Sequence, residues 1–209
     1  MGLFSRKTVT ATAATTVLEA PRPSTATGPD LSHLTGDYVI DATHSRVGFS
    51  VRHAMVTNVR GEFADYDGKL HLDGGNPADS RAELVIKVAS IDTGNEQRDG
   101  HLRTGDFFEA DAFPEITFRS TATSRIDADT YRLTGDLTIK ATTRPVVLNL
   151  DFTGTATDPY GIERVGFEGT ATIDRTDFGL TYNAALETGG VLIGEKVKLS
   201  FDISAVRAG

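Results

Sequence analysis

From Tyr38 onward the chain consists of short runs in which apolar and polar residues alternate. In the first clear run, Val47, Phe49 and Val51 are separated by small or polar residues. Successive side chains of a β-strand point to opposite faces, so this period of two predicts strands with one buried face. Further runs occupy segments 81–88, 116–119, 133–139, 146–152, 165–173 and 196–203, with turn-forming clusters of Asp, Gly, Asn and Pro between them.

Helical segments are few and short. Residues 93–109 are predicted to form a helix or a pair of short helices, with Leu102 and Phe107 on the apolar side. Residues 30–36 predict one helical turn whose two leucines plug an open end of a sheet. We therefore expect an all-β protein, a closed antiparallel β-barrel with a short helical insertion capping one end.

Composition divides the chain into two parts. Residues 1–36 form a Thr-, Ala- and Pro-rich N-terminal extension, and residues 37–207 form the predicted barrel domain. The Thr-rich start lacks the apolar run of a secretory signal, and no stretch is apolar enough for an integral membrane span. On this basis we predict a cytoplasmic protein.

Charge and cysteine content exclude several function classes. The 209 residues carry a formal net charge of −8, which argues against nucleic acid as a partner. The chain contains no cysteine, so it has no disulfide, thiolate metal site or cysteine nucleophile. No metal-binding motif and no nucleophile elbow occurs. We predict no metal, no cofactor and no catalytic residue.

The interior of such a barrel is either filled or hollow. Small residues at inward positions, such as Ala82 and Gly135, can interdigitate with phenylalanines and fill the barrel. They can equally leave a narrow apolar tunnel, which suits an amphiphile with its tail inside and its head at the mouth. The sequence alone leaves both alternatives open.

The polar residues also admit two interpretations each. His53 is in phase with the inward residues, so it is either a hydrogen-bonded core histidine or a contact to a ligand head group. His44 is interpreted as part of a turn. Arg175 and Asp177 are two residues apart at a strand end and are predicted to pair across the barrel rim.

Several short motifs, in order, carry a resemblance to a known family. They include the segments 38–49 (YVIDATHSRVGF), 98–102 (RDGHL), 113–118 (FPEITF) and 174–179 (DRTDFG). In their order and spacing they resemble the YceI-like family of polyisoprenoid-binding, lipocalin-like β-barrels, over about residues 34–206. The segment 183–192 resembles actinobacterial members.

This resemblance implies an extended barrel that encloses a long isoprenoid or other lipid-like chain, acts as a carrier or store, and forms a homodimer. The sequence departs from the family at Tyr38, where the family often has Trp, at Ala141 and at Asp174. The predicted ligand-binding residues are Val47, Phe49, Val51, His53, Phe63, Leu84, Ile86, Arg98, His101, Phe107, Phe118, Leu137, Ile139, Leu148, Phe152, Phe167, Arg175 and Phe178.

Three hypotheses of function follow. The first is a non-catalytic carrier or store for a polyisoprenoid, an isoprenoid quinone or a fatty-acyl lipid. The second is a barrel enzyme that acts on a small apolar substrate with His53 or His101 as general base, favoured by a histidine at the blind end of the pocket with a carboxylate behind it. The third is a filled barrel that serves only as an interaction module.

Overall fold

The computed structural model describes residues 30–187 and 189–208 of the chain. Within them the strands are β1 (Gly36–Ile40), β2 (Arg46–His53), β3 (Thr57–Phe63), β4 (Tyr66–Leu72), β5 (Arg81–Lys87), β6 (Ile91–Asp92), β7 (Glu115–Arg125), β8 (Thr130–Ile139), β9 (Thr142–Thr157), β10 (Glu163–Asp174) and β11 (Ile193–Arg207). The helical elements there are α1 (Glu96–Arg103) and the 3₁₀ turns η1 (Ser32–Leu34), η2 (Ala42–His44), η3 (Pro77–Asp79), η4 (Val88–Ser90) and η5 (Arg175–Phe178). The long extension before residue 30 lies outside the described residues.

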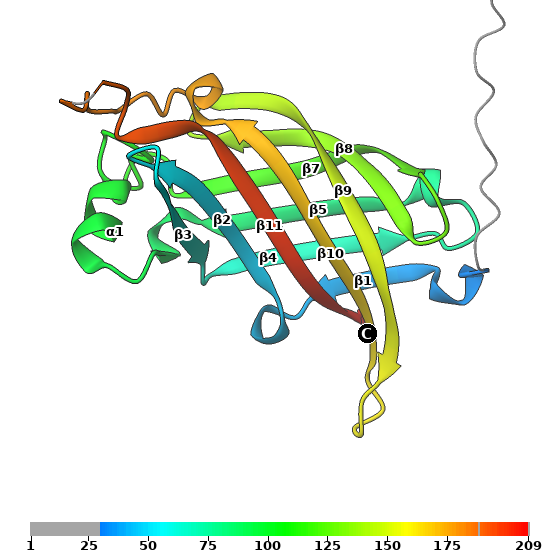
Figure 1. Ribbon diagram of the computed structural model, residues 1–209. Helices are drawn as coiled ribbons and strands as arrows, with labels where there is room; N and C mark the ends of the chain where they lie inside the picture. Colours follow the sequence, from blue (N-terminus) through cyan, green and yellow to red (C-terminus); the bar gives the residue numbers. More distant parts are fainter. Residues whose placement is uncertain (1–29, 188, 209) are drawn as a thin grey trace, which may run out of the picture.

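The strands close into an antiparallel barrel with eight strand positions around its wall (Figure 1). At three of these positions the strand is interrupted and its two halves carry separate labels: β1 and β2 on either side of η2, β3 and β4, and β5 and β6 on either side of η4. Both β1 and β2 pair with β11, and this pairing closes the barrel. The prediction of a closed antiparallel barrel is therefore confirmed, and the breaks explain why the alternation in the first half of the sequence comes in shorter runs.

The helical insertion fills a gap in the wall. β5 pairs with β7, whereas its continuation β6 pairs only with β3 among the described residues. The chain between β6 and β7 holds α1, which begins where the side chain of Asn95 accepts a hydrogen bond from the backbone N–H of Arg98. This insertion covers one end of the barrel, as predicted, and Figure 1 shows it there.

The opposite end carries the short turn η1. Leu34 is 3% exposed, and its carbonyl accepts a hydrogen bond from the hydroxyl of the fully buried Tyr38. Arg207 donates to the carbonyls of His33 and Thr35. Gly74 packs so closely against Leu31 that a side chain there would overlap the Leu31 carbonyl. The turn is thus tied down on the barrel end.

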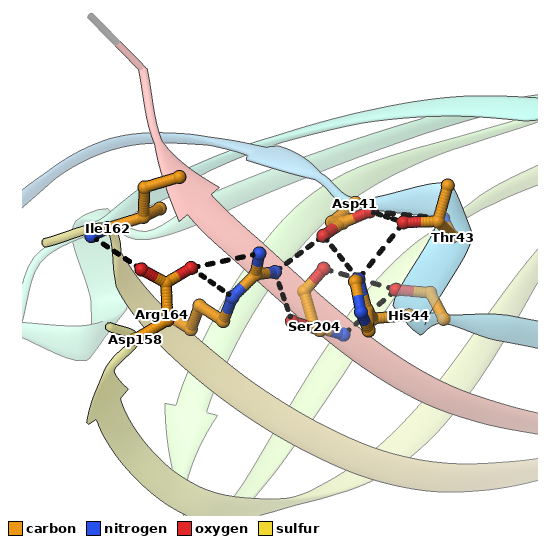
Figure 2. A network of polar contacts seen from close by, with 8 residues as sticks. Asp41, Thr43, His44, Asp158, Ile162, Arg164 and Ser204 are labelled. Carbon is orange, nitrogen blue, oxygen red and sulfur yellow. Dashed lines mark hydrogen bonds and ion pairs between the residues drawn. The ribbon is translucent and has the colours of Figure 1, made fainter. Parts of the chain in front are cut away.

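The barrel seam, where β1 and β10 flank β11, is held by a polar network (Figure 2). Arg164 lies between two carboxylates and donates to Asp41 at 2.5 Å and to Asp158 at 3.4 Å. His44 is bonded through Nδ1 to Asp41 at 2.8 Å, so its interpretation as a turn residue is confirmed. Hydrogen bonds from Thr43 and Arg164 hold the pKa of Asp41 far below its usual range.

No helix among the described residues combines the length and apolar character needed to cross a membrane.

Candidate ligand-binding cavity

The barrel encloses a cavity of about 470 Å³ with an almost entirely apolar wall. The wall runs from Leu31 and Leu34 at the η1 end to Leu102 and Phe107 at the α1 end. This volume lies within the range of about 300–1,000 Å³ that is usual for small-molecule sites. The barrel is therefore hollow, and interdigitating side chains fill the rest of its interior.

Glycines partly account for how the phenylalanines fit inside. A Cβ atom on Gly135 would lie within 2.4 Å of the ring of Phe118, and one on Gly61 within 2.5 Å of the ring of Phe49. Each ring thus occupies space that a larger neighbour would take. The interdigitation that the sequence allowed does occur, and a cavity remains beside it.

Nearly all of the predicted ligand-binding residues lie in the cavity wall. The structure places there Val47, Phe49, Val51, His53, Phe63, Leu84, Ile86, Arg98, His101, Phe107, Phe118, Leu137, Ile139, Leu148, Phe152, Phe167 and Arg175. Phe178 does not line the cavity; it is 2% exposed and packs in the core within η5. The strand period ends before η5, so it gives no direction for the Phe178 side chain.

The sequence interpretation missed two groups of wall residues. The first continues the same strand faces and was visible in the alternation; it comprises Leu70, Leu72, Leu133, Val146, Leu150, Ile173, Val197, Leu199, Phe201 and Ile203. The second comes from the segment between η5 and β11, where no period exists; it comprises Leu180, Tyr182 and Leu192.

At the α1 end an aromatic cluster forms the edge of the cavity. The ring of His101 meets those of Phe107 and Tyr182 edge-on, with centroids 5.1 and 5.0 Å away. Its Nε2 is 2.8 Å from the carboxylate of Asp106, and both side chains are about half exposed, at 41% and 53%. His101 therefore presents its ring to the cavity and its polar edge to solvent.

Arg98 lies on the same helix and is fixed by the preceding turn. Its guanidinium donates to the Thr93 hydroxyl at 2.7 Å and to the Thr93 carbonyl at 2.8 Å. The buried Asp99 accepts from the backbone N–H of Thr93 at 3.0 Å. Thr93 thus joins the two charged side chains and orients Arg98 at the cavity edge.

Arg175 does not pair with Asp177, contrary to the prediction from sequence. It is 4% exposed, and its guanidinium donates to the carbonyls of Gly194 at 2.9 Å and Tyr182 at 3.0 Å, and also to those of Leu180 and Ile193. The carbonyls of Leu180 and Tyr182 belong to the segment that folds over the α1 end, and those of Ile193 and Gly194 to the start of β11. Arg175 holds that segment against the barrel while part of its side chain lines the cavity.

His53 and the η3 end complete the polar wall. His53 ends β2 and faces inward, as predicted, and among the described residues its ring makes no hydrogen bond. Near η3 the charged wall residues are already paired: Glu83 with Arg119 at 2.9 Å, and Arg81 with the carbonyls of Ala78 and Ser80. Among the histidines and arginines discussed for the α1 end, His53 is therefore the wall residue whose side chain has no partner within the described residues.

The described residues contain no group of three or more His, Asp or Glu side chains placed to hold a metal ion. His53 and His101 belong to different elements, β2 and α1, and His101 is bonded to Asp106.

Sequence comparison places the chain beside proteins of one family. The family model of the YceI-like domain matches residues 38–205. A UPF0312 protein of Photorhabdus laumondii is 39% identical over 149 residues, which cover 70% of this chain and 77% of that protein. A UPF0312 protein of Staphylococcus aureus is 38% identical over 170 residues, which cover 81% and 95%.

Solved structures show the same fold. The YceI protein of Campylobacter jejuni has 31% identity and a TM-score of 0.65, covering 81% of this chain and 96% of that one. BcnA of Burkholderia cenocepacia has 24% identity and a TM-score of 0.70, covering 79% and 98%. A structure described as a polyisoprenoid binding domain from Saccharophagus degradans has 16% identity and a TM-score of 0.62, covering 82% and 98%.

Proposed function

The chain belongs to the YceI-like family, and on that premise we propose that its barrel binds, and carries or stores, a long apolar amphiphile without changing it chemically. The cargo is a polyisoprenoid, an isoprenoid quinone or a fatty-acyl lipid. The apolar tail lies among the wall residues, and the head group lies near Arg98, His101 and His53. We propose that all of these side chains contact the ligand.

The observation that carries this proposal is the shape and chemistry of the cavity. It extends from η1 to α1 along the barrel, and its wall is apolar except near the two ends. Each buried methylene of a tail contributes roughly 0.8 kcal/mol, so a long chain is held without a charged anchor. The Saccharophagus domain, described as polyisoprenoid binding, supports the same class of cargo through its fold.

Of the two histidines considered as a general base, His101 is the one with a carboxylate behind it among the described residues. His101 is bonded to Asp106, but the pair is about half exposed at the edge of the cavity and not at a blind end. His53, which faces inward, has no carboxylate partner among the described residues. This arrangement favours holding a head group over abstracting a proton from a buried substrate.

We also propose a cytoplasmic location, which the sequence suggests, and a homodimer, which the family resemblance implies. Fractionation of the native host tests the first, and sedimentation of the purified full chain tests the second.

The test of the function is to fill the cavity from one wall position. Ala82 lies in the wall on β5, whereas Ala122 on the neighbouring β7 is exposed. We expect Ala82→Phe to displace two or more methylenes of the tail and to weaken binding of a prenyl alcohol about tenfold or more. Ala122→Phe adds the same ring outside and serves as the matched control.

The measurement is native mass spectrometry of the full chain from its own host, followed by titration with the prenyl alcohol. A co-purified isoprenoid or acyl species that Ala82→Phe loses and Ala122→Phe keeps supports the proposal. Wild-type protein that carries nothing and takes up no prenyl or acyl chain overturns it.

A further inference from the structure

The turn between β2 and β3 presents apolar side chains to solvent beside the cavity edge. Met55 is 59% exposed and Val56 is 79% exposed. Ala54 and Met55 have φ of 47° and 62°, the left-handed region that Asn and Gly adopt most easily. The sequence thus uses apolar residues in a tight turn where polar or glycine residues fit with less strain.

A second apolar segment lies against this turn. The backbone N–H of Ala54 donates to the carbonyl of Leu192 at 2.7 Å. A Cβ atom on Gly190 would be 3.9 Å from Cγ of Met55, so Gly190 lies beside the Met55 side chain. On this segment Tyr182 and Val191 are 37% and 38% exposed. Met55, Val56, Tyr182 and Val191 are called the mouth rim below.

The mouth rim borders the cavity directly. Tyr182 and Leu192 on one side and His53 on the other are wall residues. In Figure 1 the β2–β3 turn, α1 and the segment before β11 lie at the same end of the barrel. An apolar tail that leaves the cavity past these wall residues would meet the mouth rim before it met water.

Unpaired cations lie on the outer face of the sheet just behind the rim. Ser50 on β2 is flanked by Arg60 on β3 and Lys198 on β11, and Arg52 lies two residues nearer the turn. Residues two apart in a strand share a face, so Arg60, Lys198 and Ser50 lie on the face opposite the inward Val51. Arg52 shares that face and also borders the cavity, so it lies at the cavity edge. All three are exposed, and among the described residues none forms an ion pair or side-chain hydrogen bond.

Two carboxylates of this face are paired, and one, Glu195 in the irregular start of β11, is exposed and forms no ion pair among the described residues, against three unpaired cations. Glu62 is bonded to Arg46 at 2.6 Å, farther from the turn, and Asp174 is bonded to Lys196 at 3.1 Å. The face behind the rim is therefore locally basic in a chain whose net charge is −8. Exposed apolar side chains in front of a basic face are the arrangement by which proteins lie on anionic membrane surfaces.

We propose that the mouth rim docks on a lipid bilayer with anionic head groups, with Met55 and Val56 entering the interface and Arg52, Arg60 and Lys198 meeting the head groups. Docking places the cavity mouth at the bilayer, where an apolar cargo passes between membrane and barrel without crossing water. The passage of cargo rests on the proposed function; the docking itself does not.

The test measures binding of the cargo-free full chain to vesicles by flotation. The vesicles are made of phosphatidylcholine alone or of phosphatidylcholine mixed with phosphatidylglycerol. We expect binding to the mixed vesicles that weakens as salt is raised. The double variant Met55→Ser, Val56→Ser should lose at least tenfold in affinity, and the triple variant Arg52→Gln, Arg60→Gln, Lys198→Gln should lose the salt dependence.

The chain offers a matched control at the other end of β10. Tyr160 and Ile162 in the β9–β10 turn are 89% and 43% exposed, and only their backbone N–H groups take part in the seam network. Tyr160→Ser, Ile162→Ser should leave vesicle binding unchanged. Thermal melts establish that all variants are folded.

Separate readouts distinguish the two proposals. Wild-type protein that binds a prenyl alcohol but no vesicle overturns docking and leaves the proposed function standing. Protein that binds vesicles but no prenyl or acyl chain overturns the function and leaves docking standing. A lipid-free dimer that Met55→Ser, Val56→Ser dissociates, with no vesicle binding, assigns the rim to a second copy and also overturns docking.

Discussion

Two arginines at the two ends of β10 hold the barrel in different ways. Arg164, at the start of the strand, is about one-quarter exposed and lies between the carboxylates of Asp41 and Asp158. Arg175, directly after the strand, is 4% exposed and lies among backbone carbonyls with no carboxylate partner in the described residues. The first joins two loops through charge, and the second anchors a segment through its backbone.

The contacts of the two arginines differ in how they respond to pH. The partners of Arg164 titrate: the pKa of Asp41 is held low by Thr43 and Arg164, and that of Asp158 by the backbone N–H of Ile162. The carbonyl partners of Arg175 do not titrate. Burial lowers the pKa of Arg175, but a guanidinium stays charged at any ordinary pH. The contacts of Arg164 should therefore be sensitive to acid, and the carbonyl contacts of Arg175 should not.

The largest expected effect comes from removing the Arg175 guanidinium. Arg175→Met removes the donor of one buried and three partly buried hydrogen bonds to carbonyls, and we expect a loss on the order of 3 kcal/mol in the free energy of unfolding. The segment over the α1 end should loosen as well, so prenyl alcohol binding should weaken in the same variant. Urea unfolding measures the first effect and titration the second.

The control for this variant is Arg132→Met on the outer face of β8, where the side chain is exposed. It should stay within about 0.5 kcal/mol of the wild type. If Arg175→Met is as stable as Arg132→Met, the carbonyl anchor contributes nothing and the contrast between the two arginines fails.

A smaller effect is expected at the seam. Arg164→Met removes the cation between Asp41 and Asp158, but these groups are partly exposed and water replaces the lost contacts. We expect the midpoint of thermal unfolding to fall by about 2–4 °C, with ligand binding unchanged because Arg164 does not line the cavity. Calorimetry measures the midpoint; a fall as large as that of Arg175→Met would remove the distinction.

The two arginines also show how far the sequence predicts this molecule. Strand faces follow from a period of two, so wall residues such as Phe49 and Phe118 were predicted correctly. Arg175 was assigned to a pair with Asp177 because sequence spacing reveals only near neighbours. Its partner Tyr182 lies in a segment without any period, and its partner Gly194 lies at the irregular start of β11, so tertiary contacts set the path of the chain at both places.

From the sequence, a hollow barrel was one of two alternatives, and a filled barrel was the other, because side-chain contacts in three dimensions decide between them. The alternation gives the inward residues but not how far their rings reach, and the Gly135–Phe118 contact is a matter of three-dimensional fit. The exposed apolar turn at Met55 is likewise not a pattern, because a single short turn carries no period. What the sequence specifies well is the direction of a strand side chain, and what it leaves open is what that side chain touches.

The smallest expected effect tests the acid sensitivity of the seam through Asp41→Asn. The folded-state pKa of Asp41 is depressed, so its contribution to stability is fully present above the unfolded value of about 3.9 and is lost as the pH falls toward the folded value. The wild type should therefore exceed Asp41→Asn in stability near pH 6, and the gap should narrow steadily below about pH 4. Urea midpoints across this range measure the gap, with Asp136→Asn on the outer face of β8 as control. Arg175→Met should differ from the wild type by a nearly constant amount between pH 6 and about pH 3, because its carbonyl partners bind no protons and the pKa of the neighbouring Asp174 is lowered to about 2 by Thr176 and Lys196. A gap that narrows in acid for Arg175→Met but stays constant for Asp41→Asn would reverse the assignment of the two arginines.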